Sequence, residues 1–177
     1  MEFDFLGWPA DEPTLRLDWR RFAYAGKFVM SNTGKAVARD DDLVGAVSFN
    51  ADRTDDATGW LRYVTVREDY RGDGVGPRLC AFATDRLHER YGTVNIAVNN
   101  PFAYHALHKA GFGWTGDSTG LAELVLAHPA LADGSTADAD YRTGLRRYRD
   151  RDLSDEEAAF VAEKLDAGAP ESREPPA

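Results

Sequence analysis

The stretch that decides the fold runs from residue 64 to residue 79 and reads Val64-Thr-Val-Arg-Glu-Asp-Tyr-Arg71-Gly-Asp-Gly-Val-Gly76-Pro-Arg-Leu79. A β-branched run leads into a glycine-rich loop, and the loop leads into a segment of helical apolar spacing. Glycines let a backbone approach a ligand closely, and a helix N-terminus offers free N–H donors and positive potential. The stretch therefore predicts a strand, an anion-binding loop and a helix, which together suit a phosphate or pyrophosphate group.

Two better known phosphate motifs are excluded by the details of this loop. The loop lacks the Gly-Lys-Ser/Thr ending of the phosphate loop of nucleotide triphosphatases. Its glycine spacing is G-x-G-x-G, whereas dinucleotide folds carry G-x-G-x-x-G. A glycine-rich loop alone is also typical of a structural turn, so the assignment depends on a second motif.

That second motif follows in residues 94–112. Val94-Asn-Ile-Ala-Val98 is predicted to be a strand, which Asn99-Asn100-Pro101 ends. Residues 102–110 are predicted to form a helix that ends at Gly111-Phe112. The order of elements is thus strand, helix, strand, helix.

Both motifs resemble signatures of the GNAT family of N-acetyltransferases. Arg71-Gly-Asp-Gly-Val-Gly76 looks like the family's Gln/Arg-x-x-Gly-x-Gly/Ala sequence. Asn100-Pro-Phe-Ala103, followed by Gly111-Phe112, is similar to its Asn-x-x-Ala…Gly-Phe ending. The matched core runs roughly from Leu43 to Phe112.

The resemblance implies an α/β (α+β) fold with a mixed, mostly antiparallel central sheet flanked by helices. It also implies a splay between the cofactor strand and the following parallel strand. We expect a GNAT domain over residues 1–131, an acidic linker and helical extension over 132–166, and a disordered tail over 167–177. Ser154-Asp-Glu-Glu157 is a capping box, so a helix is expected to continue through 158–165.

The remaining elements are predicted from periodicity. Strands are expected at residues 14–18, 35–39, 43–50, 59–66 and 121–127, and helices at 18–29 and from 76 to about 90. Residues 132–140 are small, acidic and polar, and they are predicted to be a linker.

The resemblance implies acetyl-CoA as cosubstrate and assigns most of the site to backbone groups. Residues Gly72, Asp73, Gly74, Val75, Gly76 and Pro77 would cradle the pyrophosphate through backbone N–H groups, although Pro77 removes one donor. Arg71 and Arg78 could add positive charge, and the alternative for each is a solvated surface residue.

Further residues of the site follow from the resemblance alone. Backbone groups of Val64, Thr65 and Val66 would meet the pantetheine arm as an added strand would. An N–H near Val66 would polarise the thioester carbonyl. Asn99 and Asn100, with Ala103 in the same motif, lie where the family asparagine meets the cofactor. The alternative is that Asn-Asn-Pro is only a turn and a helix cap.

The general acid and base are less well marked. Many family members carry a Tyr four residues before the Gly of the Gly-Phe pair, where this chain has Leu107. Tyr104, on a neighbouring helical face, is the candidate acid, with core packing as the alternative. Glu68 is the candidate base, with a solvent-facing loop acid as the alternative. Deprotonation through water would need neither residue.

The leading functional prediction is an N-acetyltransferase that moves the acetyl group of acetyl-CoA to a primary amine of a small molecule or protein. Direct attack in a ternary complex is expected. The alternative, favoured by Leu107, is a non-catalytic acyl-CoA-binding or regulatory domain. A nucleotide-binding domain of another kind is disfavoured by the glycine spacing.

Charge limits the partners. The chain has a formal net charge of −9 and a pI of about 4.9, so nucleic acid is a poor candidate partner and a cationic amine a better one. Lysine is scarce and Asp abundant, as in proteins of high-salt cytoplasms; ordinary solubilising charge is the alternative. A monomer or homodimer is expected.

Compartment and metal chemistry are predicted by absences in the sequence. No apolar run approaches the ~20 residues of a membrane span, and the acidic N-terminus does not resemble a secretory signal, so a cytoplasmic location is expected. Cys80 is predicted to be a buried structural thiol. The histidines at 88, 105, 108 and 128 form no ligand cluster with it, so no metal is expected.

Overall fold

The computed structural model describes residues 1–120 and 122–177, which fall into two compact units. The first unit comprises residues 1–94 and 175–177, and the second comprises residues 95–174. Strands and helices are mixed in both, and the strand pairs within them are antiparallel. The predicted mixed α/β class with a mostly antiparallel sheet is therefore confirmed.

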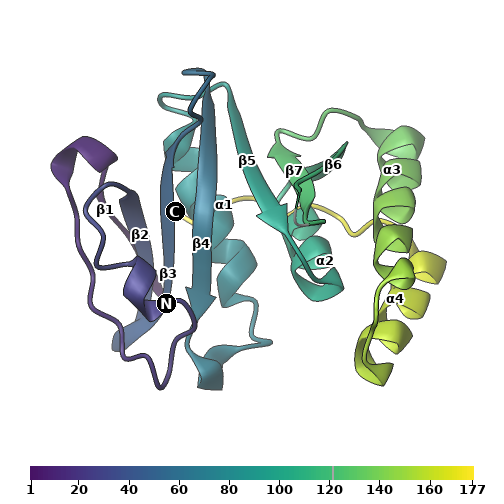
Figure 1. Ribbon diagram of the computed structural model, residues 1–177, viewed down its shortest axis with the longest axis horizontal. Helices are drawn as coiled ribbons and strands as arrows, with labels where there is room; N and C mark the ends of the chain where they lie inside the picture. The colour runs from purple at the N-terminus through teal and green to yellow at the C-terminus, as the bar shows by residue number, and fades with distance from the viewer. Residues whose placement is uncertain (121) are drawn as a thin grey trace. The chain divides into compact units, whose positions relative to one another are not determined.

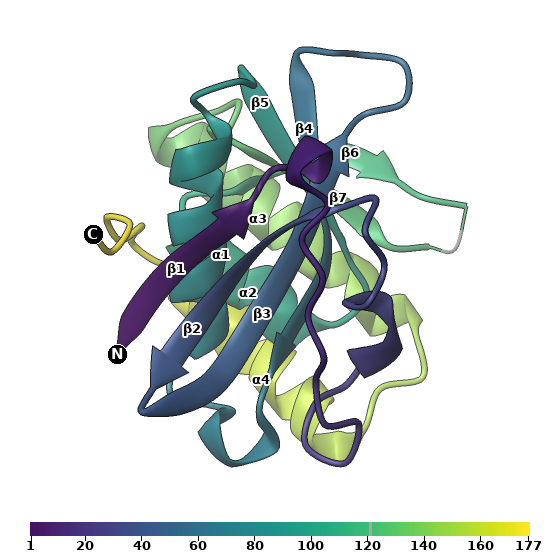
Figure 2. The same ribbon diagram turned by 90° about the vertical axis from the view of Figure 1, so that its left-hand side faces the viewer.

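The first unit is built on four strands. β1 (Glu2–Gly7), β2 (Gly34–Asp40), β3 (Asp42–Ala51) and β4 (Thr58–Val66) pair in that order (Figures 1 and 2). The last three were predicted. β1 was not, although its residues alternate between charged and apolar side chains.

The sheet of the first unit is covered on both faces. α1 (Val75–Leu87) packs on one face, where the hydrogen of Gly45 leaves room for Leu79 and Val75. The other face carries Ala46, and it is covered by Phe28 of the segment 8–33, which we call the strap. The strap contains two short 3₁₀ helices, η1 (Pro9–Asp11) and η2 (Ala25–Lys27).

The predictions of a strand at 14–18 and a helix at 18–29 are wrong. Leu15 and Leu17 alternate as strand residues do, but they pack onto the face of the sheet instead of pairing with a strand. The backbone of the strap is held by Lys35, whose Nζ donates to the carbonyls of Pro13 and Met30, both at 2.6 Å. These two carbonyls lie just before and just after the predicted strand and helix, so Lys35 anchors this part of the strap at both ends.

The second unit begins within β5 (Thr93–Val98) and continues with α2 (Pro101–Lys109). β6 (Gly113–Ser118) and β7 (Leu124–His128) form an antiparallel pair, and α3 (Gly134–Arg147) and α4 (Asp155–Ala167) follow. β5, α2, β7 and α4 match predicted elements, although Leu121 of the predicted strand 121–127 lies outside the described residues. β6 was not predicted.

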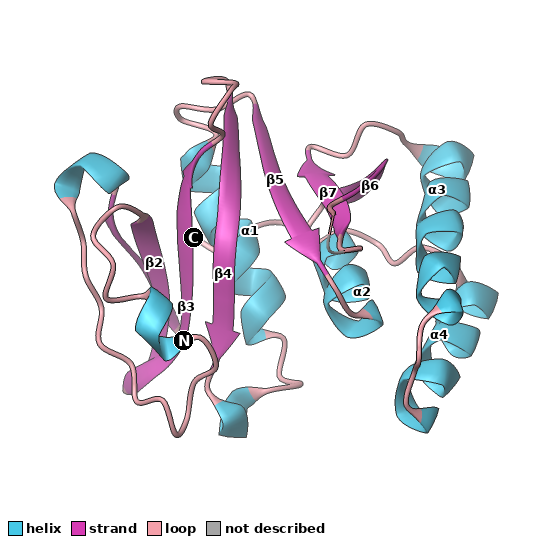
Figure 3. Cartoon of the chain, in the orientation of Figure 1, coloured by secondary structure: helices cyan, strands magenta, loops and turns pink. Residues whose placement is uncertain are grey.

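The prediction of an acidic linker over 132–140 is wrong, because α3 begins at Gly134 (Figure 3). Its first half is polar, but Tyr141 and Leu145 are fully buried one turn apart. Tertiary packing of these side chains stabilises a helix that local composition does not favour.

The capping box of α4 is confirmed. Ser154 Oγ accepts the N–H of Glu157 at 3.1 Å, and Glu157 Oε1 accepts the N–H of Ser154 at 3.3 Å. After α4 the chain forms no further helix or strand in the part described, but the N–H of Arg173 donates to the carbonyl of Lys109. Disorder of the tail stays a prediction. No helix among the described residues is long and apolar enough to cross a membrane.

Candidate active site

The loop between β4 and α1 has the conformation that its glycines predict. Gly72 has φ +90° and Gly74 has φ +75°, in the left-handed region that favours glycine. A Cβ built on either residue meets no atom within 4 Å in the part of the chain that the structure describes. The backbone of the loop is therefore uncovered at these two glycines, as close approach by a ligand requires.

Gly74 is also the N-cap of α1, and no side chain of the described residues caps the helix there. The first N–H groups of a helix have no partner within it, and here Pro77 contributes none. Val75 and Gly76 are thus the donors of the first turn, since the N–H of Arg78 already bonds the carbonyl of Gly74 at 3.4 Å. The geometry suits an anion held by backbone N–H groups.

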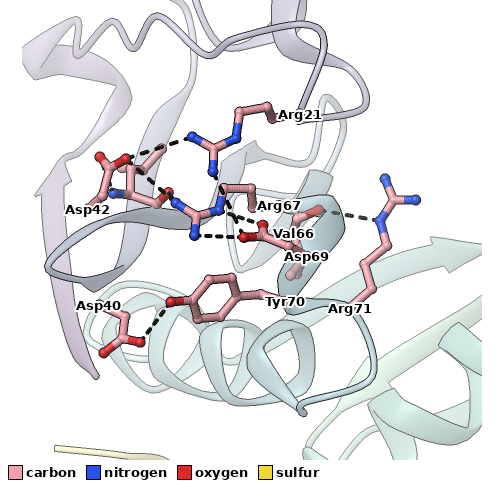
Figure 4. Close-up of polar contacts among 9 residues, drawn as sticks. Arg21, Asp40, Asp42, Val66, Arg67, Asp69, Tyr70 and Arg71 are labelled. Carbon is pink, nitrogen blue, oxygen red and sulfur yellow. Dashed lines mark hydrogen bonds and ion pairs between the residues drawn. The ribbon is translucent and has the colours of Figure 1, made fainter.

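A network of charged side chains fixes the start of this loop (Figure 4). Arg67, which is 8% exposed, donates to both carboxylate oxygens of Asp69 at 2.6 and 3.0 Å. Its Nη1 lies 3.5 Å from Asp42. The Tyr70 hydroxyl donates to Asp40 at 2.9 Å. Hence η3 (Glu68–Tyr70) is tied to the turn between β2 and β3.

The same network shifts the pKa values of its members. The hydrogen bond from Arg67 lowers the pKa of the Asp69 carboxyl, and Asp69 in turn raises the pKa of Arg67. The strap is also bonded to η3, because the carbonyl of Arg21 accepts the N–H of Glu68 at 3.0 Å. Sequence reasoning missed this network, because residues 40–42 have the composition of a solvated acidic turn and nothing local marks their partners.

The charged residues predicted to meet phosphate are placed differently from one another. Arg71 is exposed beside the loop, and its Nε donates to the carbonyl of Val66 at 3.4 Å. Arg78 instead lies over the ring of Phe3, 5.2 Å from its centroid. Asp73 is exposed in the loop itself. Phosphate contacts from Arg71 and Arg78 stay predictions, and the structure favours Arg71.

The end of β4 pairs with β3 as an ordinary antiparallel ladder. Thr65 is opposite Ala46 and Val66 is opposite Gly45. The Thr65 side chain is buried, and its hydroxyl has no hydrogen-bond partner among the described residues. The use of the Val64, Thr65 and Val66 backbone by a pantetheine arm stays a prediction, as does the splay.

In the second unit, the asparagine pair ends β5 and begins α2. Asn100 is the N-cap of α2, and its Oδ1 accepts the N–H of Ala103 at 2.9 Å. Its Nδ2 donates to Oδ1 of Asn99 at 3.3 Å. The predicted helix cap is confirmed, while a contact of Asn99, Asn100 or Ala103 with a cofactor stays a prediction.

Tyr104 lies in the core of the second unit, as the core-packing alternative predicts, and its role as general acid stays a prediction that this burial disfavours. The side chain has no exposed surface, and its hydroxyl donates to the carbonyl of Tyr141 at 2.9 Å. The ring packs on Tyr141 and Tyr148, with centroids 5.5 and 5.6 Å away. Burial raises the pKa of Tyr104. A phenol enclosed in this way has a packing role.

The structure also places the other residues that were considered for catalysis. Leu107, at the position of the family tyrosine, is buried. Glu68 is exposed as the first residue of η3, which agrees with a solvent-facing loop acid. Its role as base stays a prediction. Cys80 is confirmed as a buried thiol, and burial raises its pKa to about 12.

A strand, a glycine-rich loop and an uncapped helix N-terminus lie in the order that the sequence motif predicts for an anion-binding site. The acetyltransferase (GNAT) family matches residues 1–112, and the chain belongs to this family. Members of the family use acetyl-CoA, so the predicted cosubstrate is confirmed at the level of the family. No curated protein matches the chain.

Solved structures of acetyltransferases are similar to part of the chain. A nourseothricin acetyltransferase is 28% identical with a TM-score of 0.47, and the match covers 54% of this chain and 64% of that one. A ribosomal-protein-alanine N-acetyltransferase from Brucella melitensis is 20% identical, with coverages of 54% and 67% and a TM-score of 0.45. A GNAT acetyltransferase from Elizabethkingia anophelis with acetyl-CoA bound is 16% identical, with coverages of 54% and 74% and a TM-score of 0.45. The chain thus spans less than two thirds of the first of these proteins.

Proposed function

We propose that the protein is an N-acetyltransferase that transfers the acetyl group of acetyl-CoA to a primary amine of a small molecule or protein. The observation that carries the proposal is the open loop at Gly72 and Gly74, which leads into an uncapped α1. Backbone N–H groups there suit the pyrophosphate of acetyl-CoA, and the exposed Arg71 beside the loop adds positive charge.

The reaction would be a direct attack within a ternary complex. The amine nitrogen forms a bond to the thioester carbonyl carbon, and the carbon–sulfur bond breaks. The amine loses a proton and the departing thiolate gains one. A backbone N–H near Val66 is the candidate for stabilising the oxyanion. Because Tyr104 is enclosed, we infer that water carries the protons, with Glu68 as the side-chain alternative.

The acceptor is expected to be cationic when free in water, because a protein with a net charge of −9 attracts cations. The amine must still be neutral when it attacks the thioester, so proton removal is part of the reaction.

The second candidate function is an acyl-CoA-binding or regulatory domain without catalysis. It is favoured by two positions of α2, since Leu107 replaces the family tyrosine and Tyr104 is buried with its hydroxyl bonded. Binding would then persist while turnover is absent.

A thiol-release assay with acetyl-CoA and a panel of amines and peptides separates the two functions. The enzyme releases free CoA when a suitable amine is present, above the rate without an acceptor. Calorimetric binding of acetyl-CoA with no release for any amine would favour the binding domain. A preference for hydroxyl acceptors would contradict an N-acetyltransferase.

A further inference from the structure

The segment after α3 reaches back to the C-terminal end of β5. Tyr148, the first residue of η4 (Tyr148–Asp150), donates its hydroxyl hydrogen to the carbonyl of Val98 at 3.1 Å. Arg151 donates through Nη1 to the carbonyl of Asn99 at 3.1 Å and through Nη2 to the carbonyl of Ala122. These donors lie beyond residue 112, where the family match ends.

The two donors form one unit. The Arg151 guanidinium lies over the Tyr148 ring, 4.7 Å from its centroid, and the Tyr148 side chain is fully buried. A planar fork of N–H groups can bridge two carbonyls at once, which a lysine ammonium on a flexible stem does less well. Arg151 therefore ties the end of β5 to the turn that precedes β7.

Consecutive residues of β5 and its turn are thus held from outside the matched region. The carbonyls of Val98 and Asn99 are fixed by Tyr148 and Arg151, and the next residue, Asn100, caps α2 through the N–H of Ala103. The bond to the Val98 carbonyl is buried, and a buried carbonyl without a donor is costly. The bond to the Asn99 carbonyl is exposed, and Arg151 acts there by bridging Asn99 to Ala122. Loss of either donor should loosen the turn.

We propose that Tyr148 and Arg151 are positioning residues, which hold the Asn99–Asn100 turn in place for acetyl-CoA. This rests on the proposed function and on the prediction from the family resemblance that the turn meets acetyl-CoA. Neither residue is a catalytic residue, because each acts through the carbonyl that it binds. The C-terminal extension then serves the site as well as the stability of the second unit.

The test compares Arg151→Ala, Arg151→Lys and Tyr148→Phe with a matched control, Arg149→Ala, which removes an exposed arginine from the same short helix. Steady-state kinetics give kcat and the KM for acetyl-CoA, and hydrogen exchange reports on residues 98–103. Arg151→Ala should raise the KM about tenfold, the size expected for a hydrogen bond to a charged group. It should also speed exchange at the turn.

The variants should rank in a defined way. Arg151→Lys should fall closer to Arg151→Ala than to the wild type, and Tyr148→Phe should also raise the KM, while Arg149→Ala should change neither readout. A lower melting temperature with an unchanged KM would overturn the proposal, as would unchanged exchange at residues 98–103. A wild-type protein that binds no acetyl-CoA would refute the proposed function instead, and the exchange data would still decide whether Arg151 fixes the turn.

Discussion

Single residues determine which catalytic roles the site can support, and Tyr104 is the clearest case. Its place in the sequence, three residues before Leu107, makes it the only nearby phenol for the family's general acid. Its hydroxyl instead satisfies a backbone carbonyl in the core. A buried carbonyl needs a donor, so the same hydroxyl has a structural explanation.

Tyr104→Phe should therefore lower stability and leave turnover unchanged. The variant removes the donor to the Tyr141 carbonyl, which costs about 1 kcal/mol in the free energy of unfolding. Denaturant titration measures the first effect and thiol release the second. A large fall in kcat with unchanged stability would restore Tyr104 as the acid.

Arg67 should matter for the cosubstrate although it lies outside the loop. Arg67→Ala removes the paired bonds to Asp69 that hold η3, so we expect weaker acetyl-CoA binding by about fivefold. Arg21→Ala is the control, because Arg21 approaches Asp69 only to 3.9 Å and should change affinity less. Equal affinities for both variants and the wild type would show that the network does not position the loop.

Prediction from sequence succeeds for elements with local signals and fails for elements that are stabilised by residues far away in the chain. β2, β3, β4, α1, β5 and α2 have strong periodicity or clear start and stop signals, and each was predicted. The strap and α3 depend on Lys35 and on Tyr141, whose partners lie far along the chain. The loop at Gly72 and Gly74 was predictable because glycine spacing is local, whereas the network around Arg67 was not.

Substitution of Lys35 tests whether its hydrogen bonds hold the strap in place. Its ammonium has no exposed surface, and burial lowers its pKa. Lys35→Met would leave the carbonyls of Pro13, Met30 and Thr33 without their donor. The free energy of unfolding should fall by about 3 kcal/mol. Lys27→Met, which removes an exposed lysine from the same strap, should have little effect, and equal losses would contradict this role for Lys35.

At the scale of the whole molecule, acid should weaken the fold through α2. A hydrogen bond of 2.7 Å joins His105 Nδ1 to the Tyr141 hydroxyl oxygen. His108 Nδ1–H donates to the Tyr104 carbonyl, also at 2.7 Å. Burial lowers the pKa of each to about 4. In the unfolded chain both histidines bind a proton near the ordinary histidine pKa of about 6.5.

The sign of the pH effect follows from this difference. The neutral histidines contribute fully above about pH 6.5, and their contribution is lost as the pH falls toward about 4, because the unfolded state binds protons first. His108 alone accounts for about 3 kcal/mol. Denaturant titrations across this range should show a shallower loss of stability for His108→Leu than for the wild type. Parallel curves would contradict the prediction.

The central claim is that acetyl-CoA is held at Gly72 and Gly74, and a calorimetric titration of acetyl-CoA into glycine variants tests it most directly. Gly74→Val adds a β-branched side chain at φ +75° in the open space of the loop. Gly134→Val is the matched control, at φ +55° and also in open space at a helix start. We predict binding to the wild type and to Gly134→Val, and at least about tenfold weaker binding to Gly74→Val. Equal affinity of the two variants for acetyl-CoA would contradict the claim.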